Sequence, residues 1–207
     1  MVQQTVTPQR GKRDSQPAWD VARLFPDQGS WDDEDYLALS TNQLVELSDG
    51  SVEVLPMPTM RHQAIVQYLS NLLLAFAAAG DLGRVLFAPL RVRLRPGKFA
   101  EPDVVFMSAA HRQRMGNRFW EGADLVMEVV SESEQDRQRD YIAKREAYAA
   151  AGIAEYWIVD PQQSLITVLT LQNGAYQLRG EFRPGTIAIS ELVPGFSVDV
   201  TATFAVQ

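Results

Sequence analysis

DLVMEVVSESEQDRQRDYIAKREAYAAAGIAEYWIVD spans residues 124 to 160 and largely decides how the rest of the chain is interpreted. It predicts a strand over 125–130, a polar turn, a helix that begins near Asp136, and a second strand over 155–159. The first strand is almost continuously apolar, which is typical of a strand covered on both faces of a sheet. Glu128 nevertheless lies in its middle, and burying an ionised carboxylate without a partner is costly. We therefore expect a basic side chain, a metal ion or a bound proton beside it.

Length and composition indicate one globular domain. The chain has 207 residues, 46% of them hydrophobic, which suits a full core. No apolar run approaches the roughly 18 residues of a membrane span, and the N-terminus lacks the apolar region of a secretory signal. The absence of cysteine excludes disulfides and zinc–thiolate sites and fits a reducing cytoplasm, while the lack of an apolar span predicts no membrane contact. We expect residues 1–18 to be a disordered tail and 19–207 to be a single domain.

The charge of the chain leaves nucleic-acid binding open. A formal net charge of -7 argues against a protein that coats nucleic acid through bulk electrostatics, but it allows a locally basic groove. Residues 84–95 look extended, and apolar residues there alternate with Arg91, Arg93 and Arg95. This row of arginines is either a solvated sheet surface or a surface that contacts phosphates.

Turn and capping signals predict the other elements. Asp-Gly and Asn-Gly pairs predict β-hairpins, a capping box predicts a short helix, and apolar residues at three- and four-residue steps predict a long one. In chain order these elements are a short helix begun by residues 30–33, a hairpin of 43–47 and 52–55, a helix over 60–79 ended by Gly80, a strand over 101–107, an excursion over 108–123 with a turn of helix, a hairpin of 165–171 and 176–179, and a tail of strands and turns.

Three carboxylates, Glu46, Asp103 and Glu128, lie within apolar strand segments. They either point outward, pair with arginines, or serve a functional site. If the strands of Asp103 and Glu128 are neighbours, both side chains project from one end of the sheet. There they would bind Mg²⁺ or Mn²⁺, which prefer oxygen ligands, and a water bound to the metal would serve as nucleophile.

The helix after Glu128 adds a cation. Asp140, Lys144 and Tyr148 are spaced i, i+4 and i+8, so they share one helix face. Either this face carries an ordinary surface ion pair, or it turns toward the carboxylates. In the second case Lys144 would stabilise the charge that develops on a transferring phosphoryl group.

Taken in order, these residues resemble the restriction endonuclease family often labelled Uma-two, part of the PD-(D/E)XK nuclease superfamily. The similarity covers roughly residues 30–200. The segments that carry it are Leu44–Leu47 with Asp49-Gly50, Pro58–His62, Pro102–Val105, Asp124–Ser131, Asp140 with Lys144 and Tyr148, and Gly152–Pro161.

The resemblance implies an α/β (α+β), restriction-endonuclease-like fold, in which helices flank a mixed central sheet and β-hairpins are added. It also implies metal-dependent hydrolysis of phosphodiester bonds. Asp103 and Glu128 would be the metal ligands, the backbone carbonyl of Val129 would be another, and Glu46 would orient water or a second ion. Lys144 would supply the cation of the site.

Two features depart from the family pattern. The superfamily's lysine normally lies two residues after the glutamate, a position held here by Val130, so the resemblance supplies Lys144 from the following helix instead. The turn at 131–134 reads SESE where Ser-Pro-Ser-Thr is usual, and its two negative charges would repel a phosphate backbone. His62 matches the family's histidine at the start of the long helix, where it either bonds locally or faces the site as a proton carrier.

The sequence therefore predicts a Mg²⁺- or Mn²⁺-dependent endonuclease that cleaves DNA. The alternative is a catalytically silent nuclease fold that serves as a DNA-binding or dimerisation module, and a hydrolase acting on another substrate is a third possibility. Exposed hairpins at both ends of the chain suggest a homodimer. The predicted catalytic residues are Glu46, Asp103, Glu128 and Lys144, with His62, Asp140 and Tyr148 as further candidates.

Overall fold

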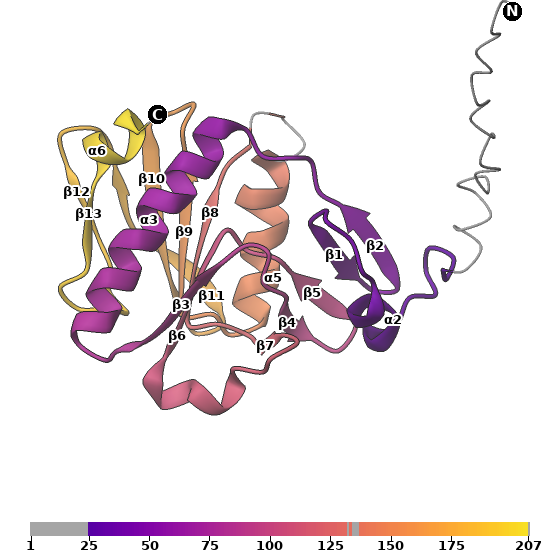
Figure 1. The fold of residues 1–207 in the computed structure, drawn as a ribbon. Coiled ribbons are helices and arrows are strands. Elements are labelled where there is room, and N and C mark those ends of the chain that lie inside the picture. Colours follow the sequence, from indigo (N-terminus) through magenta and orange to yellow (C-terminus); the bar gives the residue numbers. More distant parts are fainter. Residues whose placement is uncertain (1–24, 132, 134–136, 207) are drawn as a thin grey trace, which may run out of the picture.

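A six-stranded mixed sheet forms the centre of the fold, in the order β11-β10-β9-β8-β6-β3 (Figure 1). The structure is a computed structural model that describes residues 25–131, 133 and 137–206. β8 and β9 are parallel, and the other neighbouring pairs are antiparallel. The strands of this sheet are β3 (Gly83–Phe87), β6 (Val104–Ser108), β8 (Leu125–Val129), β9 (Glu155–Asp160), β10 (Leu165–Gln172) and β11 (Ala175–Phe182).

The predicted strand–helix–strand unit supplies the parallel pair. Parallel neighbours need a crossover connection, and here it contains the π-helix η2 (Arg139–Ala143) followed directly by α5 (Lys144–Ala150). β8 ends at Val129, one residue before the predicted end, and β9 extends to Asp160. The helix start expected near Asp136 lies outside the described residues, as does the tail expected at the N-terminus.

Helices cover both faces of this sheet, as expected for the fold class (Figure 1). On one face, α3 (Met60–Ala79) packs through residues such as Leu69 against a core that includes Trp157. The predicted bounds of this helix are confirmed, and Gly80 is its C-cap. On the other face, α5 contributes Tyr148 to a second apolar core. The first face is completed by β12 (Ile187–Ile189), β13 (Ser197–Asp199) and α6 (Val200–Ala205).

A smaller sheet, in the order β2-β1-β5-β4-β7, lies beside the larger one. The predicted first hairpin forms its β1–β2 edge, and Asp49 and Gly50 both have positive φ in the turn, as this kind of hairpin requires. Tyr36 and Phe99 pack in the apolar core of this part. The remaining elements are α2 (Asp33–Ala38), β1 (Val45–Ser48), β2 (Ser51–Val54), β4 (Val92–Arg95), β5 (Lys98–Ala100), the 3-10 helix η1 (Ala109–Arg114) and β7 (Trp120–Glu121).

The arginine-bearing segment differs from the prediction. Residues 84–95 do not form one extended run but are divided between β3 of the larger sheet and β4 of the smaller one. The arginines are not a free phosphate-binding row, because Arg93 pairs with Asp33 and Glu121, and Arg95 pairs with Asp49. α2, β7 and the first hairpin bring these carboxylates to the arginines.

Two local predictions are corrected. The capping box of α2 consists of Asp32 and Asp35 and not of residues 30–33, because Asp32 is the last residue with extended backbone before the helix. The C-terminal tail is not made only of strands and turns, since it ends in α6, which is capped by the Asp199 side chain.

In the described part of the chain, no helix is both long enough and apolar enough to cross a bilayer.

Candidate active site

Asp103 and Glu128 lie side by side because they come from neighbouring antiparallel strands. Asp103 directly precedes β6, Glu128 lies within β8, and these two strands pair. The expected neighbourhood of the two strands is thereby confirmed. Asp103 Oδ2 accepts a hydrogen bond of 2.8 Å from the backbone N–H of Val129. Only 8% of Asp103 and 3% of Glu128 is exposed, so both carboxylates are withdrawn from solvent.

The helix after β8 places a cation against Glu128. Lys144 Nζ lies 2.9 Å from Glu128 Oε2 and 3.3 Å from Asp140 Oδ1. The hydroxyl of Tyr148 donates a hydrogen bond of 2.5 Å to Glu128 Oε1. Asp140, Lys144 and Tyr148 are all buried. The helix face therefore points inward, and it does not carry the surface ion pair that was the alternative.

Packing against β9 holds this helix face in place. The rings of Tyr148 and Tyr156 meet edge to face with centroids 5.1 Å apart. The Tyr156 hydroxyl donates a 2.8 Å hydrogen bond to the backbone carbonyl of Asp140. Tyr156 and Trp157 are fully buried and thus belong to the core, where bases cannot stack on them. The second strand of the central stretch therefore orients the helix that carries Lys144.

His62 reaches the site from the start of α3. Its backbone N–H donates a 3.2 Å bond to the hydroxyl of Thr59, the N-cap, while its Nε2 lies 3.2 Å from Asp103 Oδ2. The local bond therefore comes from the main chain, and the side chain faces the site. Burial opposes the charged imidazole, but the hydrogen bond to Asp103 and the charges of Asp103 and Glu128 outweigh it and raise the pKa of His62.

Glu46 borders the cluster, and Glu101 adds a carboxylate that the sequence analysis did not single out. Glu46 is only partly buried, which corrects the expectation of an interior residue, and its Oε1 accepts a 3.2 Å bond from the Glu101 N–H. Glu101 is buried and accepts a 3.0 Å bond from the Val45 N–H. Burial raises the pKa of Glu101. It could have been found, because it lies two residues before Asp103 and alternate residues of an extended chain share a side.

Several carboxylates surround Lys144, and burial together with the charges of the neighbouring groups shifts the pKa values of the cluster. Burial opposes the charged form of Lys144, but the charges of Glu128, Asp140, Glu46 and Asp103 outweigh it, so the pKa of Lys144 is raised and its amine stays protonated. Burial raises the pKa of Glu128 to about 8, against the opposing charge of Lys144. Burial likewise raises the pKa of Asp140. Burial thus favours the protonated forms of Glu128 and Asp140, while the surrounding carboxylates favour the charged form of Lys144.

A cavity of about 30 Å³ lies among these side chains, which is room for about one water or one ion. Among the described residues, no three Asp, Glu, His or Cys side chains are already grouped as a metal site. Mg²⁺ needs less, because it is commonly held by one or two carboxylates and keeps several waters. Asp103 and Glu128 therefore fit such an ion by their chemistry. The polar and charged residues that line the cavity are His62, Glu101, Asp103, Glu128, Ser131, Arg139, Asp140 and Lys144.

Comparison with known proteins identifies the family of the chain and supports its fold. The family Uma2, described as "Putative restriction endonuclease", matches residues 33–201. The chain belongs to the Uma2 family. Among solved structures, this Uma2 protein is similar to a putative nuclease of the DUF820 family from Anabaena variabilis, with a TM-score of 0.68 and 17% identity over 83% of this chain and 96% of that one. That likeness confirms the fold. No protein with a curated description matches the sequence.

Proposed function

We propose that this Uma2 protein is a metal-dependent endonuclease that hydrolyses phosphodiester bonds in DNA at a PD-(D/E)XK-type site. The observation that supports the proposal best is the contact of Lys144 with Glu128 beside Asp103, all three lining one small cavity. Pro102-Asp103 would be the first part of the motif and Glu128 the second. Lys144 would take the place of the lysine that the motif has at Val130.

Mg²⁺ or Mn²⁺ would be held by Asp103, Glu128 and the Val129 carbonyl, and when bound it would supply charge stabilisation and an acidified water. The chain's own groups would do the rest. Lys144 donates hydrogen bonds from a permanently charged amine and would stabilise negative charge that develops on the phosphoryl oxygens. Glu46 would orient water from the border of the cluster. The cavity walls limit the number of competing water molecules.

The supporting residues each have a defined task in this proposal. Tyr148 and Asp140 hold Glu128 and Lys144 in position through the contacts described above. His62 holds the Asp103 carboxylate and could carry a proton to or from the site. Glu132 and Glu134, whose charges would repel phosphate, lie outside the described residues.

Cleavage of plasmid DNA tests the proposal. Wild-type protein should nick or linearise the DNA with Mg²⁺ or Mn²⁺ and should be inactive with a chelator. Asp103→Asn should abolish cleavage, because the amide is a poor ligand for a hard cation. Asp81→Asn is the matched control and should cleave like wild type, since the Asp81 side chain is 93% exposed and does not line the cavity. Wild-type protein that cleaves no DNA with either metal contradicts the proposal.

A second candidate is the catalytically silent DNA-binding or dimerisation module. The net charge of -7 and the two glutamates of the turn at 131–134, which would repel a phosphate backbone, favour it. Titration calorimetry with Mn²⁺ separates the two, because a silent module need not bind the metal, whereas the endonuclease must do so through Asp103. The homodimer and the cytoplasmic location remain predictions. Light scattering checks the first by the mass of the particle, which should be twice 23.1 kDa.

A further inference from the structure

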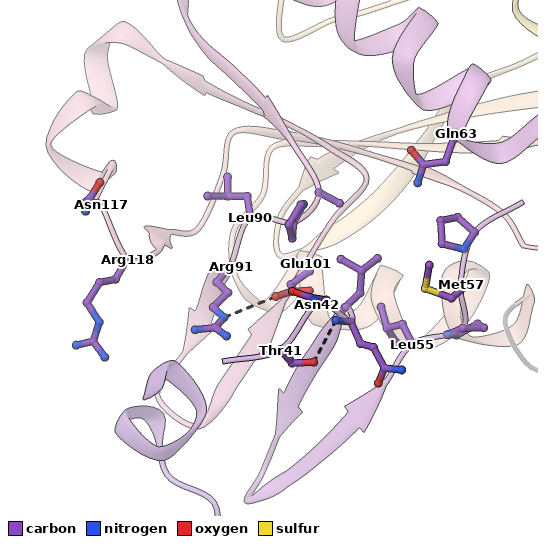
Figure 2. Close-up of a pocket in the computed structure, with 16 residues that line it drawn as sticks. Thr41, Asn42, Leu55, Met57, Gln63, Leu90, Arg91, Glu101, Asn117 and Arg118 are labelled. Carbon is purple, nitrogen blue, oxygen red and sulfur yellow. Dashed lines mark hydrogen bonds and ion pairs between the residues drawn. The ribbon is translucent and has the colours of Figure 1, made fainter. Parts of the chain in front are cut away.

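A groove of about 600 Å³ (Figure 2) opens beside the cavity of the candidate active site. Its walls come from the segments around the first hairpin, from residues 88–91, and from Asn117, Arg118 and Gln63. The groove and the cavity share part of their walls, so an extended ligand bound in the groove would reach the carboxylates. The shared residues are Leu44, Leu55, Pro56, Pro58 and Glu101.

The cations of this groove are already paired. Arg91 donates hydrogen bonds of 3.0 and 2.9 Å to two carbonyls of α2 and its C-cap, and its Nε lies 3.6 Å from Glu101 Oε1. Arg118 lies 3.1 Å from Glu34 Oε2. In Figure 2, Glu101 lies between the two sides of the groove, next to Arg91. With each arginine matched to a carboxylate, the groove has little net charge to attract phosphates.

Besides the Thr41 hydroxyl, amide side chains provide the uncharged polar groups of the groove. The exposed amides of Asn42, Gln43, Gln63 and Asn117 line it, and within the described part of the chain none of these four side chains is hydrogen-bonded to another side chain or to the backbone. Figure 2 shows Asn117 and Gln63 on opposite sides. An amide offers both a donor and an acceptor, which is the pattern that base edges require. Met57, which is 77% exposed, and Leu90 add apolar surface for the faces of bases.

We propose that this groove binds the bases of an unpaired nucleic-acid strand and so directs single-stranded or locally opened DNA to the site. A closed duplex presents its phosphates outward and uses its Watson–Crick edges for pairing, so the neutral, amide-lined groove suits it poorly. Unpaired strands expose both edges and faces of their bases. The inference rests on the proposed function, because that function assigns nucleic acid as the substrate.

Fluorescence anisotropy with the full chain and a chelator tests the groove without cleavage. The probes are a labelled single-stranded DNA oligonucleotide and the duplex made from it. We expect the single strand to bind at least about tenfold more tightly. Asn42→Ala and Gln63→Ala should each weaken its binding about three- to tenfold, the loss expected for one or two hydrogen bonds. Gln177→Ala, an exposed amide on β11, is the matched control and should bind like wild type.

The salt dependence gives a second readout. Binding through bases should give a shallow log–log dependence on salt, no steeper than about −2, since each neutralised phosphate of a single strand contributes about −0.7. The inference is overturned if the duplex binds as tightly as the single strand, if neither binds, or if the two groove variants bind like wild type. These failures are distinguishable from failure of the proposed function. Metal-dependent cleavage of duplex DNA without strand preference would contradict only the groove, and single-strand binding without any cleavage would contradict only the nuclease.

Discussion

Lys144 reaches Glu128 from α5, which packs on the side of β8 that carries the Glu128 side chain. Glu128 and Val130 are two residues apart, and Val130 lies in the apolar core that Tyr148 also enters. A helix packed on that side brings a long side chain to the carboxylate without interrupting the strand. The site keeps its ion pair while position 130, directly after the strand, stays apolar.

Lys144→Ala is expected to lower the free energy of unfolding by about 3–5 kcal/mol, because Glu128 would remain buried without its cation and Asp140 would keep, among the described residues, only Arg139, at 3.9 Å. Urea denaturation followed by tryptophan fluorescence measures the change. Adding Glu128→Gln should recover part of the loss, since the buried carboxyl group that lost its cation is then replaced by a neutral amide. A double variant as unstable as the sum of its single variants would contradict this. Arg112→Ala, which removes a 3.9 Å surface ion pair, should cost less than about 1 kcal/mol.

Glu128 also predicts how stability changes with pH. Its pKa rises from an ordinary value of 4.5 to about 8 in the folded protein, so its ionisation opposes folding. Its contribution is complete below pH 4.5 and is lost as the pH rises through about 8. Glu128→Gln cannot ionise and should become more stable relative to wild type as the pH rises from about 5 to about 8. Denaturation midpoints in chelator check this, and a difference that does not vary with pH would contradict it.

At the scale of elements, α3 joins the site to the core. Its first turn presents His62 to Asp103, while its buried stripe, which includes Leu69, packs against the larger sheet. The apolar spacing of this helix predicted both its length and its buried side. The packing of α3 against the sheet therefore also fixes the position of His62 relative to Asp103.

Leu69→Ala should lower the free energy of unfolding by about 2–5 kcal/mol, because Leu69 is fully buried and the substitution leaves a cavity. Leu74→Ala is the matched control on the same helix, and since Leu74 is 47% exposed it should cost less than about 1 kcal/mol. Thermal or urea denaturation measures both variants. Similar losses in the two would mean that the buried side of α3 is misassigned.

At the scale of the whole molecule, Glu155 connects the central sheet to the C-terminal segment. This carboxylate has no exposed surface. Its Oε1 accepts bonds of 2.7 Å from Trp157 Nε1 and the Ser190 hydroxyl, and its Oε2 accepts bonds of 2.7 and 2.9 Å from the N–H groups of Glu191 and Leu192. Four donors satisfy the charge, so this acidic residue is structural although it lies in the same central stretch as Glu128.

Glu155→Gln should therefore lower the free energy of unfolding by about 1–3 kcal/mol, since an amide cannot accept bonds at both atoms. Glu181→Gln, at an exposed position of β11, should change it by less than about 0.5 kcal/mol. Denaturation compares the two. Cleavage per folded molecule should be unchanged in Glu155→Gln, and a selective loss of activity without a loss of stability would contradict the structural role.

The sequence by itself determined the local elements, which are the helix over 60–79, the hairpins and the strand–helix–strand unit, and it singled out Asp103 and Glu128 as carboxylates whose burial would need a reason. Spacing and turn chemistry are local properties, so they can be read along the chain. The tertiary structure alone decided the partners. It paired Glu128 with Lys144 and Asp103 with His62, matched Arg93 to Glu121, and gave Glu155 its four donors. These partners cannot be read from periodicity, because contacts between residues distant in sequence depend on how the sheets and helices pack together.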